Sequence, residues 1–110
     1  MNETADLLKK LLADTFAFYL KTHYFHWNIE GPDFPQYHDF LNNLYEDVYG
    51  AVDPTAELIR SIGEYAPGSF SRYSELTTIK DSRSTPLPMA IFSELYMDNM
   101  IVLQSLNNVS

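Results

Sequence analysis

The side chains of this sequence that are best suited to metal chemistry are three histidines and a pair of carboxylates. The histidines are His23, His26 and His38, and a neutral imidazole nitrogen binds zinc, copper or iron near neutral pH. Asp53 and Glu57 are four residues apart, so on a helix both carboxylates project from one face. These residue types together predict a site for a transition metal.

The spacing of the ligands predicts that one chain cannot assemble this site alone. His38 and Asp53 are 15 residues apart, about 22 Å along a straight helix, whereas metal ligands lie about 2.0–2.2 Å from the ion. Two antiparallel copies of the helix, related by a two-fold axis near residue 47, would bring His38 of one copy opposite the carboxylates of the other. His26 precedes a Gly31-Pro32 turn that can return it to His38. We therefore expect two histidines from one subunit and two carboxylates from its partner. His23 falls outside this pattern and is expected to be solvated or at an interface.

A long first helix is predicted to carry His26. It would begin at a cap, Asn2 or Thr4, and stop at the Gly31-Pro32 turn, with apolar residues at helical spacing between them. Its length, about 38 Å for roughly 25 residues, is typical of a helical bundle.

The second predicted helix extends from a cap at Asp33 to Gly63 and carries the remaining ligands. Pro54 has no N–H to donate to the carbonyl of Gly50, so we expect one helix with a bend there. Two shorter helices are the alternative.

The rest of the chain predicts a long connection and one more helix. Residues 64–85 are rich in serine and threonine, and Arg72–Lys80 has the pattern of a short helix. A connection of this length is expected to cross the bundle. A third long helix is predicted from Thr85-Pro86 to the end of the chain. No stop signal follows it, and we expect a single domain, residues 1–110, that is truncated at its C-terminus.

Composition excludes several other classes of protein. The chain has 110 residues, no cysteine and a net charge of -8 from 15 acidic and 7 basic residues. A disulfide framework and a cysteine-based zinc site are therefore excluded. We expect a cytoplasmic protein, because no apolar run is long enough to span a membrane and the first ten residues do not resemble a signal peptide. Direct binding to DNA is not expected of so acidic a chain.

The ligand pattern resembles that of the Dps family, the DNA-protection-during-starvation branch of the ferritin-like proteins. The resemblance covers about residues 7–79 and is carried by His26-Trp27-Asn28-x-x-Gly31-Pro32-x-Phe34-x-x-x-His38, by Asp53-x-x-Ala56-Glu57 and by Ile62-Gly63. It implies an all-α, ferritin-like bundle with a short helix in the second connection, assembled from two-fold dimers into a hollow dodecamer. It also implies a ferroxidase that oxidises Fe(II) with hydrogen peroxide or oxygen, stores the ferric iron and so protects DNA from oxidative damage.

Carried over residue by residue, the resemblance makes His26, His38, Asp53 and Glu57 the iron ligands of a mono-iron or di-iron ferroxidase centre, with Trp27 beside the iron. Three departures from the family pattern affect this expectation. Leu58 stands where an arginine commonly follows the glutamate. Asn42 stands where the family often has an aspartate, which weakens the second iron position and makes Asn42 a second-sphere group. We also expect the fourth helix of the bundle to be absent. The alternative functions are therefore a truncated, catalytically weak helical assembly and a structural protein associated with DNA.

Overall fold

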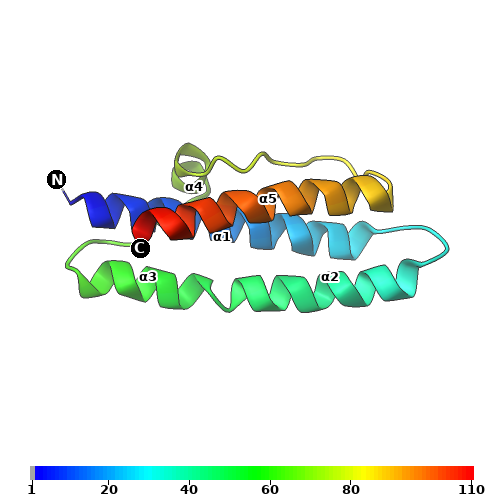
Figure 1. Cartoon of the computed structure of the whole chain (residues 1–110), viewed down its shortest axis with the longest axis horizontal. Coiled ribbons are helices and arrows are strands. Elements are labelled where there is room, and N and C mark those ends of the chain that lie inside the picture. The colour runs from blue at the N-terminus through cyan, green and yellow to red at the C-terminus, as the bar shows by residue number, and fades with distance from the viewer. Residues whose placement is uncertain (1) are drawn as a thin grey trace.

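The computed structural model describes residues 2–110, and helices make up all of the regular structure in that range. In chain order they are α1 (Glu3–Asn28), α2 (Phe34–Tyr49), α3 (Val52–Ser61), α4 (Phe70–Leu76) and α5 (Pro88–Val109). Because α2 and α3 lie end to end, the chain builds three long rods, with α1 antiparallel to the other two (Figure 1). The predicted all-α class is confirmed. None of these helices combines the length and the apolar character needed to cross a membrane.

The ends of α1 are set by local chemistry. The side chain of Asn2 accepts a hydrogen bond from the backbone N–H of Ala5 at 3.1 Å, so Asn2 is the cap and Thr4 lies inside the helix. The helix ends at Asn28, and Gly31 then takes a φ of +120°, in a region that favours glycine. This turn reverses the chain and begins α2 alongside the end of α1 (Figure 1).

The single bent helix expected over residues 33–63 is wrong, and the alternative of two shorter helices is what the structure contains. The break lies at Gly50 and Ala51, where Ala51 N–H donates to the carbonyl of Val48 at 3.0 Å and the last turn of α2 tightens. Pro54 is the third residue of α3, a position whose N–H needs no partner within the helix. The proline therefore helps to begin a new helix instead of bending an old one.

The predicted short and third helices exist with different bounds. The short helix was expected over Arg72–Lys80 but is α4, which is capped by the hydroxyl of Ser69 and ends at Leu76. Helix α5 begins at Pro88, two residues later than the predicted Thr85-Pro86 start, because Pro88 holds Leu87 in an extended conformation. The whole connection from α3 through α4 to α5 crosses from one end of the bundle to the other, as predicted (Figure 1).

Helix α1 is the central element of the core. It packs against all four other helices, whereas α2 and α5 meet through the rings of Tyr37, Phe40 and Phe92. One apolar cluster lies toward the α1–α2 turn and a second toward the other end of the rods; their largest fully buried apolar side chains are Phe25, Leu12, Leu41, Ile59 and Ile91.

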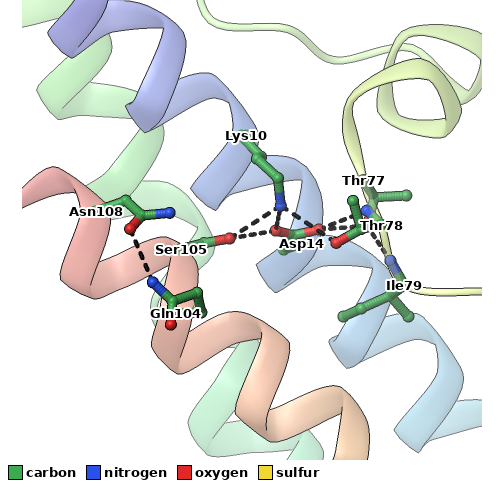
Figure 2. A network of polar contacts seen from close by, with 8 residues as sticks. All are labelled: Lys10, Asp14, Thr77, Thr78, Ile79, Gln104, Ser105 and Asn108. Carbon is green, nitrogen blue, oxygen red and sulfur yellow. Dashed lines mark hydrogen bonds and ion pairs between the residues drawn. The ribbon is translucent and has the colours of Figure 1, made fainter.

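A buried carboxylate, Asp14, joins three parts of the chain (Figure 2). One oxygen accepts hydrogen bonds from the Thr77 hydroxyl at 2.6 Å and the Thr78 backbone N–H at 3.0 Å. The other oxygen accepts from Lys10 and from Ser105 of α5. Burial raises the pKa of Asp14, but these four donors outweigh burial and hold the pKa below its usual value of 3.8. The network fixes the crossing connection onto α1 and α5.

A second polar cluster links α1 to α5 nearer the α1–α2 turn. The ammonium of the buried Lys21 lies 2.8 Å from Asp98 and 2.7 Å from Glu94, and it donates to the carbonyl of Lys80 at 2.9 Å. Burial raises the pKa of Asp98, and Lys21 opposes this effect. Lys21 therefore compensates a carboxylate that would otherwise be costly to bury.

Candidate metal centre

Two histidines meet where α1 ends and α2 begins. The ring centroids of His26 and His38 are 3.7 Å apart, with 24° between the ring planes. Nδ1 of His26 lies 2.9 Å from the carbonyl oxygen of His38, and Nδ1 of His38 lies 2.9 Å from the carbonyl oxygen of His26. A carbonyl oxygen can only accept, so each Nδ1 carries a proton and donates it. Both Nε2 atoms therefore keep a lone pair for a ligand.

The folding of this local segment follows from the sequence. Gly31 allows the tight reversal after Asn28, and the reversal returns the chain antiparallel to α1. His26 is 8% exposed on α1, while the half-buried His38 lies in the second turn of α2 and stacks on Phe34 at 5.0 Å. Each ring donates to the backbone carbonyl of the other histidine, so the backbone holds the two rings side by side.

The two carboxylates form a separate pair on α3. Asp53 and Glu57 are both exposed and one turn apart. A hydrogen bond with Asp53 and the negative charge of that residue, with a smaller effect of desolvation, raise the pKa of Glu57. Such a pair repels itself when both groups are ionised, and a bound cation would relieve the repulsion.

One copy of the chain does not bring the two pairs together. The histidines lie beside the α1–α2 turn, and the carboxylates lie beyond the far end of α2 (Figure 1). Across residues 2–110, no group of three or more histidine, aspartate or glutamate side chains is close enough to hold one ion. The role of all four residues as ligands stays a prediction. Asn42, one turn after His38, is half-buried.

His23, which was expected to be solvated or at an interface, lies in a stack of aromatic rings. Its ring is half-buried and stacks on Tyr45 at 3.8 Å with 9° between the planes. Trp27, which is exposed, lies 4.1 Å from the same ring, and the Tyr19 hydroxyl lies 3.0 Å from Nδ1. Burial, and then the neighbouring His26, lowers the pKa of His23. The four-residue spacing of Tyr19, His23 and Trp27 on one helix was the signal that could have revealed this stack.

A groove lies beside the histidine end of α1. It has a volume of about 720 Å³ and is lined by residues of α1, of α4 and of the connection that follows α4. Leu20, Trp27 and Phe70 line it and are exposed in the single chain. The face that carries Trp27 is therefore apolar as well as aromatic.

Comparison with known proteins identifies the family. The family model of the ferritin-like domain matches residues 5–110. A DNA protection during starvation protein of Helicobacter pylori is 33% identical over 97 residues, which cover 87% of this chain and 67% of that protein. The chain belongs to the Dps family of ferritin-like proteins.

Solved Dps structures agree with this assignment. The Dps protein of Vibrio cholerae, described as a member of a superfamily of ferritin-like diiron-carboxylate proteins, superposes with a TM-score of 0.93 at 28% identity. The match covers 97% of this chain and 67% of that one. Dps of Bacillus brevis gives a TM-score of 0.90, also at 28% identity, over 96% of this chain and 71% of that one. The ferritin-like fold implied by the family resemblance is confirmed.

The relatives that this chain matches are longer than the chain itself. A low temperature-induced protein of Nostoc is 29% identical over 104 residues, which are 94% of this chain but 58% of that protein. In this chain the described residues supply the three rods α1, α2–α3 and α5.

Proposed function

We propose that this chain oxidises Fe(II) at a site shared by two subunits and retains the ferric product. The observation that carries the proposal is the reciprocal hydrogen bonding of the stacked rings of His26 and His38, which in the neutral imidazoles leaves both Nε2 atoms free to bind a ligand. Nitrogen and carboxylate donors together suit Fe(II), which is the substrate.

The second half of the site would come from a partner subunit. Asp53 and Glu57 are exposed on α3, so they are available to a neighbouring copy. In an antiparallel pair about a two-fold axis, the carboxylates of each copy face the histidines of the other, and every dimer contains two sites. The exposed apolar groove beside Trp27 supports packing of a second copy against α1. Such dimers would build a hollow dodecameric cage that holds the ferric mineral.

The donor set matches the charge of the substrate. Two neutral imidazoles and two ionised carboxylates together carry a charge that balances the charge of one Fe(II) ion. If a second ion binds, Glu57 is the proposed bridging ligand. Asn42 offers a neutral amide near His38, so the second position is weaker than the first. Hydrogen peroxide or oxygen is the proposed oxidant. Conversion of Fe(II) to a retained ferric product would protect DNA by removing the reactants that form hydroxyl radicals.

Protection of DNA by this route needs no direct contact with DNA. The net charge of -8 disfavours binding to phosphates, and it favours the entry of cations into a cage. We therefore propose that the partners are other copies of the chain, Fe(II) and the oxidant.

Complementation between two inactive variants tests the shared site. One variant combines His26→Ala with His38→Ala, and the other combines Asp53→Ala with Glu57→Ala. Each alone should oxidise Fe(II) no faster than buffer. Equal coexpression makes about half of the dimers mixed, and each mixed dimer has one intact site of two, so about a quarter of the wild-type rate should return.

Removal of two carboxylates away from the predicted ligands serves as the control. A double substitution of exposed carboxylates elsewhere, Asp6→Ala with Glu75→Ala, should retain the wild-type rate. If the mixed dimers stay inactive although the wild type is active, the site is not shared. If the wild type is a monomer by light scattering and oxidises no iron, the alternative of a catalytically weak helical protein replaces the proposal.

A further inference from the structure

Helix α5 carries an apolar stripe that is exposed in the single chain. Its residues follow one another in alternate steps of three and four, which is the spacing of the seam of a coiled coil. Met89 is 77% exposed, Tyr96 59% and Leu106 48%. On the core side of the same helix, Ile91 and Leu95 are buried. We call this exposed set the α5 stripe; its members are Met89, Phe92, Tyr96, Asn99, Leu103 and Leu106.

The exposed apolar surface continues from the α5 stripe onto α2. The ring of Phe92 contacts that of Phe40 edge-on, with 5.7 Å between the centroids, and Phe40 is 54% exposed. Phe92 also meets Tyr37 of α2 at 5.0 Å. A contiguous exposed patch of large apolar side chains marks an interaction site.

The α5 stripe is uncharged in a strongly acidic chain. Glu94 and Asp98 are the charged residues in the sequence of α5, and both are held by Lys21 of α1, at 2.7 Å and 2.8 Å. By contrast, α2 exposes Glu46 and Asp47 to solvent. Charges on other faces are screened beyond a Debye length of about 8 Å at physiological ionic strength. Two copies that each carry a net charge of -8 can therefore meet along this stripe without bringing like charges into contact.

We propose that the α5 stripe binds the α5 stripe of a second copy of this chain, in an antiparallel pair about a two-fold axis between residues 97 and 98. This contact lies on α5 and is separate from the groove beside Trp27, so it does not depend on the shared iron site. The pair would join dimers to one another, or single chains where no other contact forms.

A second copy matches the chemistry of the α5 stripe better than an unrelated partner does. In coiled coils, charged residues beside the seam select a different partner chain. The residues that flank this seam are uncharged and offer no such selection: Ser93, Met100 and Asn107 on one side, and Leu95, Val102 and Val109 on the other. An anionic partner such as a nucleic acid needs basic side chains, and α5 has none. The stripe is thus complementary to itself.

The antiparallel register provides a partner for the polar member of the seam. It places Met89 opposite Leu106 and Tyr96 opposite Asn99 of the other copy. The Tyr96 hydroxyl is then within reach of the Asn99 amide, which satisfies both groups when water leaves the contact. Opposed helix dipoles also favour this orientation.

Light scattering over a range of concentrations tests the contact in the full chain. Leu20→Glu places a charge in the groove beside Trp27, where the proposed function packs a second copy, and so isolates the α5 contact. In this background the chain should be a dimer. Addition of Tyr96→Glu and Leu103→Glu brings like charges together in the seam. The dissociation constant should rise by about 100-fold or more, and the measured mass should fall to that of a monomer.

Gln104→Glu with Asn108→Glu is the matched control on the same helix. Both residues are exposed and lie outside the stripe, where they hydrogen-bond to each other at 2.9 Å (Figure 2). They add the same charge, so the Leu20→Glu chain should stay a dimer. Equal masses for the stripe variant and this control would overturn the proposal. So would a Leu20→Glu chain that is monomeric at every concentration, since another occupant would then cover the face. An α5 dimer without iron oxidation by the wild type would reject the proposed function alone.

Disulfide cross-linking tests the register, because the chain has no cysteine of its own. Met89→Cys mixed with Leu106→Cys should form a disulfide between the two variants, since a disulfide needs Cα atoms within about 7 Å of each other. Met89→Cys alone should cross-link slowly, because residue 89 of the second copy lies opposite residue 106, about 26 Å along the helix. Preferential cross-linking of Met89→Cys to itself would contradict the antiparallel pair.

Discussion

Substitution of Asp14 by alanine should be among the most damaging changes to the stability of this chain. The side chain is fully buried and accepts four hydrogen bonds from Lys10, Ser105, Thr77 and Thr78. Removal of one partner of a buried charged pair costs about 3–5 kcal/mol. The side chain of Lys10 is 32% exposed and can turn toward water, which places the expected loss near the lower end, at about 3 kcal/mol.

Chemical denaturation followed by circular dichroism measures this loss. Ser105→Ala removes one of the four donors and should cost about 1–2 kcal/mol. The control Glu75→Gln removes an exposed ion pair with Arg72 and should change the free energy of unfolding by less than about 1 kcal/mol. A domain of this size has about 5–15 kcal/mol of stability, so the three variants should separate clearly. An Asp14→Ala variant no less stable than Glu75→Gln would refute the conclusion that this network fixes the connection to α1 and α5.

Four further outcomes follow from burial and charge. The pKa of Asp14 is below 3.8 in the folded chain, so the ionised carboxylate contributes fully to the free energy of unfolding above that pH. In an acid titration, this contribution to stability should disappear as the pH falls through the lowered pKa. The same part of the pH dependence should be absent in Asp14→Ala. Lys21→Met should cost about 3–5 kcal/mol at neutral pH, and the difference from wild type should shrink in acid as Asp98 becomes protonated; a constant difference would contradict the ion pair. Phe25→Ala should cost about 3–5 kcal/mol in denaturant titrations, since the ring is fully buried. Gly63→Ala should cost about 1 kcal/mol because φ is +87°, although space is available for the methyl group; a gain in melting temperature would contradict this strain.

Local rules in the sequence accounted for most of the helices, and their failures have identifiable causes. The caps, the apolar spacing and the Gly31 turn predicted α1 and the reversal after it. The same rules favoured one helix bent at Pro54, whereas the second rod is broken at the turn of Gly50 and Ala51. A proline near the start of a helix and a proline in its interior look alike in a sequence, and only the hydrogen bonds distinguish them.

The spacing of the candidate ligands predicted how far apart they lie along the second rod. Fifteen residues of nearly continuous helix separate His38 from Asp53, and no packing of a single rod can remove that distance. The rise of the helix sets this limit, so the separation of the two pairs within one chain could be predicted before any tertiary contact was known, and completion of the site by a partner stays a proposal. Helix geometry also placed Asp53 and Glu57 on one face.

The sequence by itself therefore determined the helical class, the family pattern and the separation of the two ligand pairs, because these depend on residue type and on distance along the chain. Only the tertiary structure decided which nitrogen of each histidine is free, since this depends on carbonyl groups that the turn brings from the opposite helix. It also decided the position of His23 between Tyr45 and Trp27. Contacts between residues distant in sequence arise from packing, and helical periodicity within one segment does not specify them.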